Sequence, residues 1–547
     1  MNTNRIFHFI TLLLFFVASR LVSQTVTLGG AVKDSATTVG IDSVRVDIVN
    51  TVDPGEKYTV YTNSTGAWSY TFINTSVGND PTAPISFSVQ QNFPNPFNPS
   101  TVIPFTLHRS GSVTMTVHNI LGQLMDERSF DLSAGHFNVR WSSIGAAGVY
   151  LYTVRYGNTA VTRKMIQVDG GYGDGIGDAV LAGGISSVPN FSKNATADYT
   201  VVASRVGYEP DSTVFPLVSN QQINFSLSSV HHRAFVFDLH NDIAELMVDG
   251  YQMGIRNTSR QSDIPRFIDG GVDAQMIVLW PDPNEYPTTS YQRTVQMYDT
   301  CIAQFNRNSA KIAQSRTVAE IQSANNAGKI AAVLCVEGGT AINNNLDNLY
   351  DLYDRGARYM TITWNNSFAW ATSAADPLST TKGLSDFGKD VIRAMDSIGM
   401  IIDVSHTGIK TIEDILSVTK NPIIASHSGC RTLRNHTRNL TDTQIQAIAA
   451  GGGVIGVVFH RSFLTSTSTS TIDTVIGHID YIKNLVGIDY VALGSDYDGG
   501  ITAPTGLENV SKLPNLTMAL LKRGYTRSEV RKILGENYLR VFTAVCK

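Results

Sequence analysis

Basic charge, cysteine and long apolar runs are all scarce in this chain of 547 residues, and each shortage excludes a class of protein. Lys and Arg number 42 against 46 Asp and Glu, so the chain lacks the positive excess that binds nucleic acid. The four cysteines include no C-x-x-C spacing, which excludes a disulfide framework and a zinc ribbon, while their pairing stays open. Beyond the N-terminus no segment approaches about 20 unbroken apolar residues, so we expect no membrane span in the mature chain.

The N-terminus has the pattern of a secretory signal peptide. Arg5 precedes an apolar run from Ile6 to Ala18, and small and polar residues follow up to Ser23. This pattern predicts a signal over residues 1–23 and an exported protein that is periplasmic, at the cell surface or secreted. The alternative is a buried N-terminal helix, which the change to alternating Thr and Val after residue 24 disfavours.

The first 230 residues have the pattern of β-structure. Short alternating runs such as Val44–Ile48 and Trp68–Phe72, with turn residues between them, predict β-sandwich modules. Residues 169–189 begin with a dense run of Gly and Asp and are predicted to be a flexible linker, with a calcium site as the alternative. At roughly 150 residues per domain, the chain length predicts three or four domains in all.

Two distant parts of this first region resemble the beginning and the end of one module. Gly30–Asp34 and Asn63–Gly66 resemble the start of a carboxypeptidase regulatory-like domain, and Asp198–Tyr208 resembles its end. We therefore expect a split sandwich made of residues 24–78 and 190–230.

The sequence between these stretches has a signature of its own. The run QNFPNPFNPST at residues 91–101, followed by Gly148–Tyr152, resembles the Ig-like sorting domain of type IX secretion. We expect an inserted sandwich over 79–168, because loop tips tolerate inserted domains; the alternative is two successive sandwiches. The resemblance implies a contact with the cell surface or the secretion machinery.

After residue 230, apolar strands alternate with helical patterns. The predicted strands are Ala234–Phe237, Ala274–Leu279, Ile330–Val336, Tyr359–Thr363, Met400–Val404, Pro422–Ala425, Val454–Phe459 and Tyr490–Leu493. Eight such β/α units predict a (β/α)8 (TIM) barrel over residues 232–547. An open, doubly wound parallel sheet is the alternative.

Ionisable residues follow five of the eight predicted strands, where a barrel gathers its active-site residues. They are His240 and Asp242 after the first strand, Glu337 after the third, His406 after the fifth, His427 after the sixth, and Asp496 after the eighth. Each residue alone has a structural explanation, such as a hydrogen-bonded histidine or a helix cap. Together they predict two metal ions bridged by a carboxylate, and imidazole with carboxylate suits zinc, with manganese or iron as alternatives.

The motifs around these residues resemble, in order, those of the membrane (renal) dipeptidases, the zinc peptidases of family M19. The motifs are FDLHND at 237–242, VEGG at 336–339, IDVSH at 402–406, ASHS at 425–428, RN at 438–439, GSDYDG at 494–499 and KILGEN at 532–537. The resemblance implies two zinc ions with these ligands: His240 and Asp242 for one, His406 and His427 for the other, and Glu337 for both.

The resemblance also implies how a dipeptide is held and cleaved. Arg438 would pair with the C-terminal carboxylate of the substrate, a match that a guanidinium makes well. Asp496 would hold the free α-amino group and carry a proton for the departing amine. A hydroxide bridging the two ions would attack the peptide bond, with Glu337 and the ions in the catalytic role.

Two positions depart from the family pattern. Many relatives carry a histidine after the fourth strand that stabilises the oxyanion, whereas this chain has Trp364, so that the indole N–H or Asn365 would have to substitute. After the seventh strand, where relatives often have Asn-Phe-Tyr, His460 is expected either to line the pocket or to pack in the core.

The sequence therefore predicts an exported zinc-dependent dipeptidase with β-sandwich modules before a binuclear barrel. Its expected partners are dipeptides, and a homodimer is a further hypothesis. Another amidohydrolase-like barrel that acts on a cyclic amide, lactone or β-lactam is the alternative enzyme. A catalytically silent surface-binding protein is the alternative from a different class.

Overall fold

The protein is described here by a computed structural model that covers residues 25–546, except 53, 74–86, 94, 98–99, 108, 143, 146, 168–173, 182–197 and 217–218. The expected signal peptide, residues 1–23, lies outside the described residues. The chain forms two compact units, Met1–Arg205 with Glu209–Leu227, and Val206–Tyr208 with Ser228–Lys547. No helix among the described residues has the length and apolar character that a membrane crossing requires.

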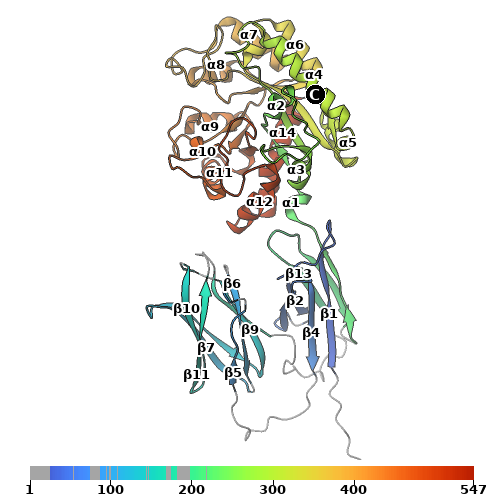
Figure 1. Ribbon diagram of the computed structural model, residues 1–547, viewed down its shortest axis with the longest axis vertical. Helices are drawn as coiled ribbons and strands as arrows, with labels where there is room; N and C mark the ends of the chain where they lie inside the picture. The colour runs from blue at the N-terminus through green and yellow to red at the C-terminus, as the bar shows by residue number, and fades with distance from the viewer. Residues whose placement is uncertain are drawn as a thin grey trace, which may run out of the picture. The chain divides into compact units, whose positions relative to one another are not determined.

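The first unit contains a sandwich whose strands come from two distant parts of the sequence (Figure 1). These strands are β1 (Thr25–Asp34), β2 (Arg45–Asn50), β3 (Lys57–Tyr61), β4 (Ala67–Ile73), β13 (Asp198–Ser204), β14 (Asp211–Pro216), β15 (Gln221–Gln222) and β16 (Phe225–Leu227). One sheet has the order β14-β13-β2-β3, and in the other β1 pairs with β4, β15 and β16. On this pairing we propose that residues 24–78 and 190–230 form one sandwich, interrupted by another.

The intervening residues form two further four-stranded sheets, with orders β11-β10-β7-β8 and β12-β9-β6-β5. Their strands are β5 (Phe87–Val89), β6 (Ser100–Leu107), β7 (Gly111–Asn119), β8 (Leu124–Leu132), β9 (Gly135–Ser142), β10 (Gly148–Tyr156), β11 (Thr159–Gln167) and β12 (Gly175–Leu181). Alternate residues of these strands are buried and include Trp141 and Tyr152, so the sheets share a core of their own.

Strand β12 lies within the segment 169–189, which the sequence predicted to be a flexible linker. The prediction is wrong for Gly175–Leu181, because these residues pair with β9 and Ile176 is buried. Gly175 has a left-handed backbone conformation with φ 75°, and a Cβ there would lie 2.1 Å from Oδ2 of Asp126. That carboxylate accepts a hydrogen bond from the Ile176 N–H. Glycine therefore serves a close approach here rather than flexibility.

The second unit is a closed parallel barrel, as predicted, and not an open sheet. Its strands are β17 (Phe237–Asp238), β18 (Ala274–Leu279), β20 (Ile330–Glu337), β21 (Ala357–Thr361), β22 (Ile401–Asp403), β23 (Ile424–Ser428), β24 (Val454–Val458) and β25 (Val491–Gly494). They pair in the order β18-β17-β25-β24-β23-β22-β21-β20, and β18 also pairs with β20, which closes the ring. A ninth strand, β19 (Ile312–Gln314), pairs with the first residues of β20, before the part of β20 that pairs with β21.

Helices surround the ring of strands (Figure 1). They are α1 (Val230–Arg233), α2 (Ile243–Val248), α3 (Ile264–Asp269), α4 (Ser290–Arg307), α5 (Val318–Asn326), α6 (Leu346–Arg355), α7 (Asp386–Ile398), α8 (Ile409–Val418), α9 (Asp442–Ala450), α10 (Arg461–Leu464), α11 (Ile472–Val486), α12 (Leu513–Lys522), α13 (Arg527–Arg531) and α14 (Asn537–Val545). In α7 the buried residues Val391 and Met395 are four positions apart, the spacing of one helix face. A capping box formed by Thr526 and Glu529 starts α13.

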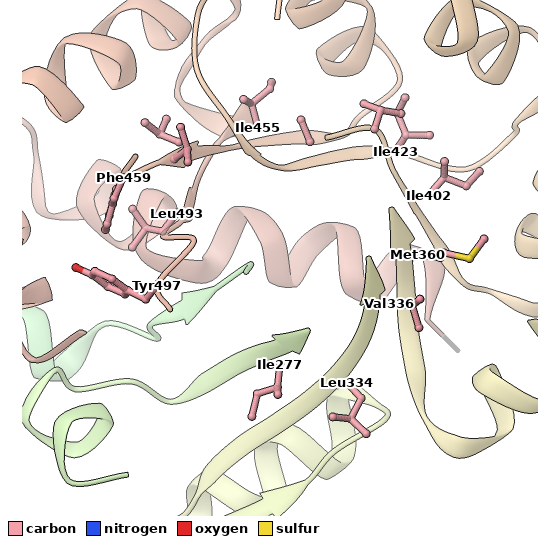
Figure 2. Packing of buried hydrophobic residues seen from close by; sticks show 14 of the residues in the cluster. Ile277, Leu334, Val336, Met360, Ile402, Ile423, Ile455, Phe459, Leu493 and Tyr497 are labelled. Carbon is pink, nitrogen blue, oxygen red and sulfur yellow. The ribbon is translucent and has the colours of Figure 1, made fainter. Parts of the chain in front are cut away.

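Alternation along the strands divides the barrel core into two layers. In β20, Leu334 and Val336 belong to the layer between the strands and the helices. Val333 and Cys335 belong to a second layer, made of strand residues that point to the opposite face of the sheet. Figure 2 shows side chains of the first layer pointing away from the ring toward the helices, among them Ile277, Leu334, Met360, Ile402 and Ile455. Glu337 continues the alternation of Val333 and Cys335, so it faces the inside of the barrel at the carboxyl end of β20.

Candidate metal centre

The predicted ligands come together at the carboxyl ends of the barrel strands and are shielded from solvent. Exposed fractions lie between 1% and 8% for the six ionisable residues, which are His240, Asp242, Glu337, His406, His427 and Asp496. Ionised groups are rarely buried unless they are paired or bind a metal. Their burial therefore points to a site with a chemical role.

Glu337 lies between two groups and turns one carboxylate oxygen toward each. Its Oε2 is 3.7 Å from Nε2 of His240. Its Oε1 is 3.0 Å from Nε2 of His406 and 3.6 Å from Nε2 of His427. This is the arrangement that a carboxylate shared by two cations requires.

Each group is compact enough to hold one ion. Beside Glu337 Oε2, the Nε2 atom of His240 lies 3.6 Å from Oδ2 of Asp242 and 3.9 Å from Oδ1 of Asp496. Beside Glu337 Oε1, the Nε2 atoms of His406 and His427 are 3.0 Å apart. The potential ligand atoms of His240, Asp242 and Asp496, like those of His240, Glu337 and His427, all lie within 4.8 Å of one another.

Two buried carboxylate oxygens at this site accept no hydrogen bond. They are Oδ2 of Asp242 and Oε1 of Glu337. A buried acceptor without a donor costs about 1–3 kcal/mol, and more when it is charged. Imidazole nitrogens and unpartnered carboxylate oxygens are the donor set that zinc and similar divalent cations prefer, so the residues present fit a metal centre.

The pKa values at the site reflect how much negative charge is crowded beside His240. Burial opposes protonation of His240, yet the charges of Asp242, Glu337 and Asp496 raise its pKa to about 10. Burial raises the pKa of Asp242 well above its usual value and that of Asp496 to about 7. Burial and the Arg438 charge lower the pKa of His406 to about 4. Bound cations would relieve the repulsion among these carboxylates.

Two of the three histidines are oriented by buried partners that contact Nδ1, the imidazole nitrogen opposite the one that faces Glu337. Nδ1 of His240 lies 2.7 Å from the Tyr359 hydroxyl, which itself donates to the Leu239 carbonyl oxygen. Nδ1 of His427 lies 2.8 Å from Oγ of Ser426. Each contact assigns the ring proton to Nδ1 and leaves Nε2 free for a metal ion.

A buried aspartate anchors the partner of His427. Oγ of Ser426 donates to Oδ2 of Asp403 at 2.6 Å, and Oδ1 of Asp403 accepts from the backbone N–H groups of Ser405 and Ser426. The motifs of the sequence contain Asp403 and Ser426, and Tyr359 begins a predicted strand, but no role was predicted for these three residues. Their positions beside a predicted ligand, or on a neighbouring strand, could have indicated that they orient the ligands.

Asn365 has a contact that the sequence did not predict. Its Oδ1 lies 3.0 Å from Nδ1 of His406, so it orients the third histidine as Tyr359 and Ser426 orient the others. This contact uses the acceptor oxygen of the amide, and the expected role of Asn365 as an oxyanion donor stays a prediction.

Two site residues adopt the left-handed backbone that side chains other than glycine rarely use. His406 has φ 63° and Asp496 has φ 64°. Such conformations cost about 1–3 kcal/mol and occur where the surroundings hold a residue in a functional position. Both residues lie two or three positions after the end of a barrel strand, where such a turn places a side chain at the mouth of the barrel.

A cavity of about 390 Å³ opens above the centre. Its lining residues are Asp242, Glu245, Trp280, Glu337, Trp364, Asn365, His406, Arg438, His460, Phe463, Asp496, Gly499 and Gly500. The structure thus brings all predicted substrate-contacting residues to one cavity. It adds Glu245, Trp280 and Phe463, which sequence reasoning missed because they lie outside the recognised motifs.

Arg438 has the free hydrogen-bonding capacity of an anion receptor. Its side chain is buried, its Nε and Nη1 atoms have no hydrogen-bond partner, and Nη2 makes a 3.4 Å contact with the His427 carbonyl oxygen. The guanidinium carbon lies 5.3 Å from the centre of the Phe463 ring. A buried cation with unused donors on a cavity wall is suited to a carboxylate.

The two residues at the departures from the family pattern also lie on the cavity wall. The Trp364 ring packs on Trp280 with 4.9 Å between centroids and lies 6.2 Å from the His406 ring. The His460 ring packs on Phe463 with 4.5 Å between centroids. His460 Nδ1 accepts from the backbone N–H of Thr502 at 3.2 Å, which leaves the ring proton of the neutral form on Nε2.

A family model places this geometry in a known group of enzymes. The model described as membrane dipeptidase (peptidase family M19) matches residues 226–547, more than half of the chain. The chain belongs to the membrane dipeptidase family. As a membrane dipeptidase family member it is a metallo-dipeptidase hydrolase, and the buried His, Glu and Asp groups are its metal-binding cluster.

Solved structures share the barrel of this membrane dipeptidase family member. The dipeptidase AC, a metallo peptidase of family M19, is 24% identical with TM-score 0.54 over 57% of this chain and 99% of that chain. A metallo peptidase from Rhodobacter sphaeroides, liganded with a phosphinate mimic of L-Ala-D-Ala, is 24% identical with TM-score 0.53 over 57% and 99%. An amidohydrolase from Pseudomonas aeruginosa is 26% identical with TM-score 0.52 over 58% and 98%.

The inserted module has a match of its own. A model described as secretion system C-terminal sorting domain matches residues 91–168, which confirms that resemblance and indicates export. In this chain the sorting module precedes the enzyme domain. The resemblance of the flanking sandwich to a carboxypeptidase regulatory-like domain stays a prediction.

Proposed function

We propose that the protein is an exported zinc-dependent dipeptidase that hydrolyses the peptide bond of free dipeptides. The observation that carries the proposal is the position of Glu337, whose Oε2 faces His240 and whose Oε1 faces His406 and His427, beneath a cavity that also contains Arg438 nitrogens without a partner among the described residues. The combination supplies a centre for bond cleavage and a receptor for a substrate terminus in one place.

The proposed ligands follow the two groups around Glu337. His240 and Asp242 would hold one ion, His406 and His427 the other, and Glu337 both. When bound, the ions supply an activated water molecule and polarise the scissile carbonyl. The donor set favours zinc, with manganese or iron as alternatives.

The protein groups around the centre would fix both ends of a dipeptide. Arg438 would bind the C-terminal carboxylate through its free Nε and Nη1 donors. Asp496, whose carboxylate lines the same cavity, would bind the α-amino group and return a proton to the nitrogen of the departing amine. Holding both termini limits the substrate to two residues.

Trp364, Asn365 and His460 would complete the substrate contacts. We assign His460 as a donor through Nε2, since its Nδ1 is occupied by Thr502. Trp364 would pack against the substrate, and Asn365, whose Oδ1 faces the ring of His406, would donate to the substrate through its Nδ2 group. A homodimer and a contact of the sorting module with the cell surface or the secretion machinery stay predictions.

A substrate panel tests the proposal. Purified protein loaded with zinc or manganese should cleave Ala- and Gly-containing dipeptides, and should cleave N-acetylated or C-amidated forms far more slowly. The likeness to an amidohydrolase at 26% identity supports a second candidate, hydrolysis of a cyclic amide, lactone or β-lactam. Turnover of such rings without cleavage of any dipeptide would replace the first proposal by the second.

A further inference from the structure

The cavity wall across from Arg438 is aromatic and acidic. Trp280 follows β18 and Arg438 follows β23, and these two strands are four positions apart in both directions around the closed ring of eight. Trp364 and Glu245 line the cavity together with Trp280. A dipeptide with its carboxylate on Arg438 and its scissile bond over Glu337 would direct its N-terminal residue toward this wall.

Glu245 brings an uncompensated carboxylate to that wall. Within the described part of the chain its side chain forms no hydrogen bond and no ion pair. Burial and the neighbouring charges of Asp249 and Asp282 raise its pKa, and the Arg293 charge opposes that shift. Arg293 itself donates to Gln296 and stacks over the Tyr286 ring.

The two tryptophans complement this carboxylate. Their rings are 4.9 Å apart at 50°, so they form a corner and not a flat stack. The indole N–H of Trp280 is buried without an acceptor. Tryptophan faces attract cations as well as apolar chains, and a carboxylate beside them selects the cation.

We infer that Glu245, Trp280 and Trp364 form the subsite for the side chain of the N-terminal residue and select a cationic chain, that of lysine or arginine. This inference rests on the proposed dipeptidase function. The long apolar stem of such a side chain would lie along the indole rings, with its charged end at the Glu245 carboxylate. The subsite has no metal ligand, so it determines preference and leaves the chemistry to the centre.

Matched dipeptides test the subsite directly. Lys-Ala and Met-Ala have N-terminal side chains of similar length that differ in charge, so their ratio of kcat/KM measures recognition of the cation. The wild-type enzyme should favour Lys-Ala by about tenfold or more, since a charged hydrogen bond is of that magnitude. Glu245→Gln should remove most of this preference, and Glu245→Lys should shift it toward Glu-Ala.

Asp249→Asn is the control, because Asp249 is an exposed carboxylate at the end of the same helix and does not line the cavity. It should keep the Lys-Ala to Met-Ala ratio of the wild type. An equal ratio in wild type and Glu245→Gln, or a wild-type preference for Met-Ala, would overturn the inference. Failure to cleave any dipeptide would instead reject the proposed function, so the two failures are distinct.

Discussion

The barrel mouth and the first β-sandwich each place a glutamate among polar partners, but they treat its carboxylate in opposite ways. In the sandwich, Glu56 accepts hydrogen bonds from Tyr58, Tyr199 and Asn50 at 2.7–2.9 Å. At the mouth, Glu337 keeps an oxygen that accepts no hydrogen bond. A polar cluster satisfied by its own chain stabilises a fold, whereas one left unsatisfied is arranged for a ligand.

The largest effect is expected from removing the charge between the two histidine groups. Glu337→Gln should reduce kcat/KM for dipeptides by at least about a thousandfold, because an amide cannot serve both groups as a carboxylate does. Steady-state kinetics with Ala- and Gly-containing dipeptides measures this loss. Unchanged turnover would mean that the centre lies elsewhere.

The matched change in the sandwich should affect stability and leave activity unchanged. Glu56→Gln should leave dipeptide turnover intact and lower the unfolding free energy by about 1–3 kcal/mol, because the amide nitrogen in place of Oε2 cannot accept from the Asn50 amide. Chemical denaturation of the two variants side by side compares them. A stability loss in Glu337→Gln as large as in Glu56→Gln would remove the distinction between the two regions.

Arg438 should affect binding more than chemistry. Arg438→Ala should raise KM for dipeptides about ten- to a hundredfold, since a charge-assisted pair to the substrate carboxylate is lost. The same variant assayed on a C-amidated dipeptide should lose much less. Equal losses on both substrates would argue against pairing with the carboxylate.

Ser426 offers a test of the contacts that orient the ligands. Ser426→Ala should weaken metal affinity about ten- to a hundredfold, because His427 loses the partner of its Nδ1–H. Competition with a chelator measures the affinity. Ser290→Ala is the control. It also removes a buried hydroxyl, one that donates to the Tyr286 carbonyl oxygen and is not part of the metal centre, and it should keep the metal affinity. Equal losses of affinity in both variants would indicate general destabilisation.

A histidine whose hydrogen bonds are all made within the protein gives a test by pH. His231 contacts Thr517 Oγ1 and the Gly270 carbonyl oxygen at 2.7 Å, and burial lowers its pKa to about 4. A folded-state pKa below the unfolded value of about 6.5 means that its stabilising effect is complete above pH 6.5 and is lost as the pH falls toward 4, by at most about 3 kcal/mol.

The difference between wild type and His231→Gln isolates this titration. The variant should be less stable at pH 7, and its unfolding free energy should fall less steeply between pH 6.5 and 4. Parallel pH profiles for the two proteins would show that His231 does not titrate as described.

Much of the barrel was predictable because its information is local. Apolar runs mark the strands, and Glu337 and His427 follow runs of this kind, so a barrel alone brings them together. The first strand was predicted at Ala234–Phe237 but is Phe237–Asp238. It begins later because Val230–Arg233 form a short helix that is capped by Ala234. Only tertiary contacts distinguish such short apolar runs.

The remaining features depend on contacts between segments that no local pattern encodes. Asn365 contacts His406 from the neighbouring strand, and Glu245 and Trp280, which follow two different strands, line the same cavity. The strand at Gly175–Leu181 was missed for another reason, because its glycines indicated flexibility when one of them accommodates the Asp126 carboxylate. Glycine content alone does not separate a linker from a close approach.

Metal content per chain tests the central claim most directly. Inductively coupled plasma mass spectrometry on zinc-loaded, gel-filtered protein should give two zinc ions per wild-type chain and no more than one for Glu337→Gln. Fewer than two ions in the wild type, or two ions retained by the variant, would contradict a centre in which Glu337 is shared between two metal ions.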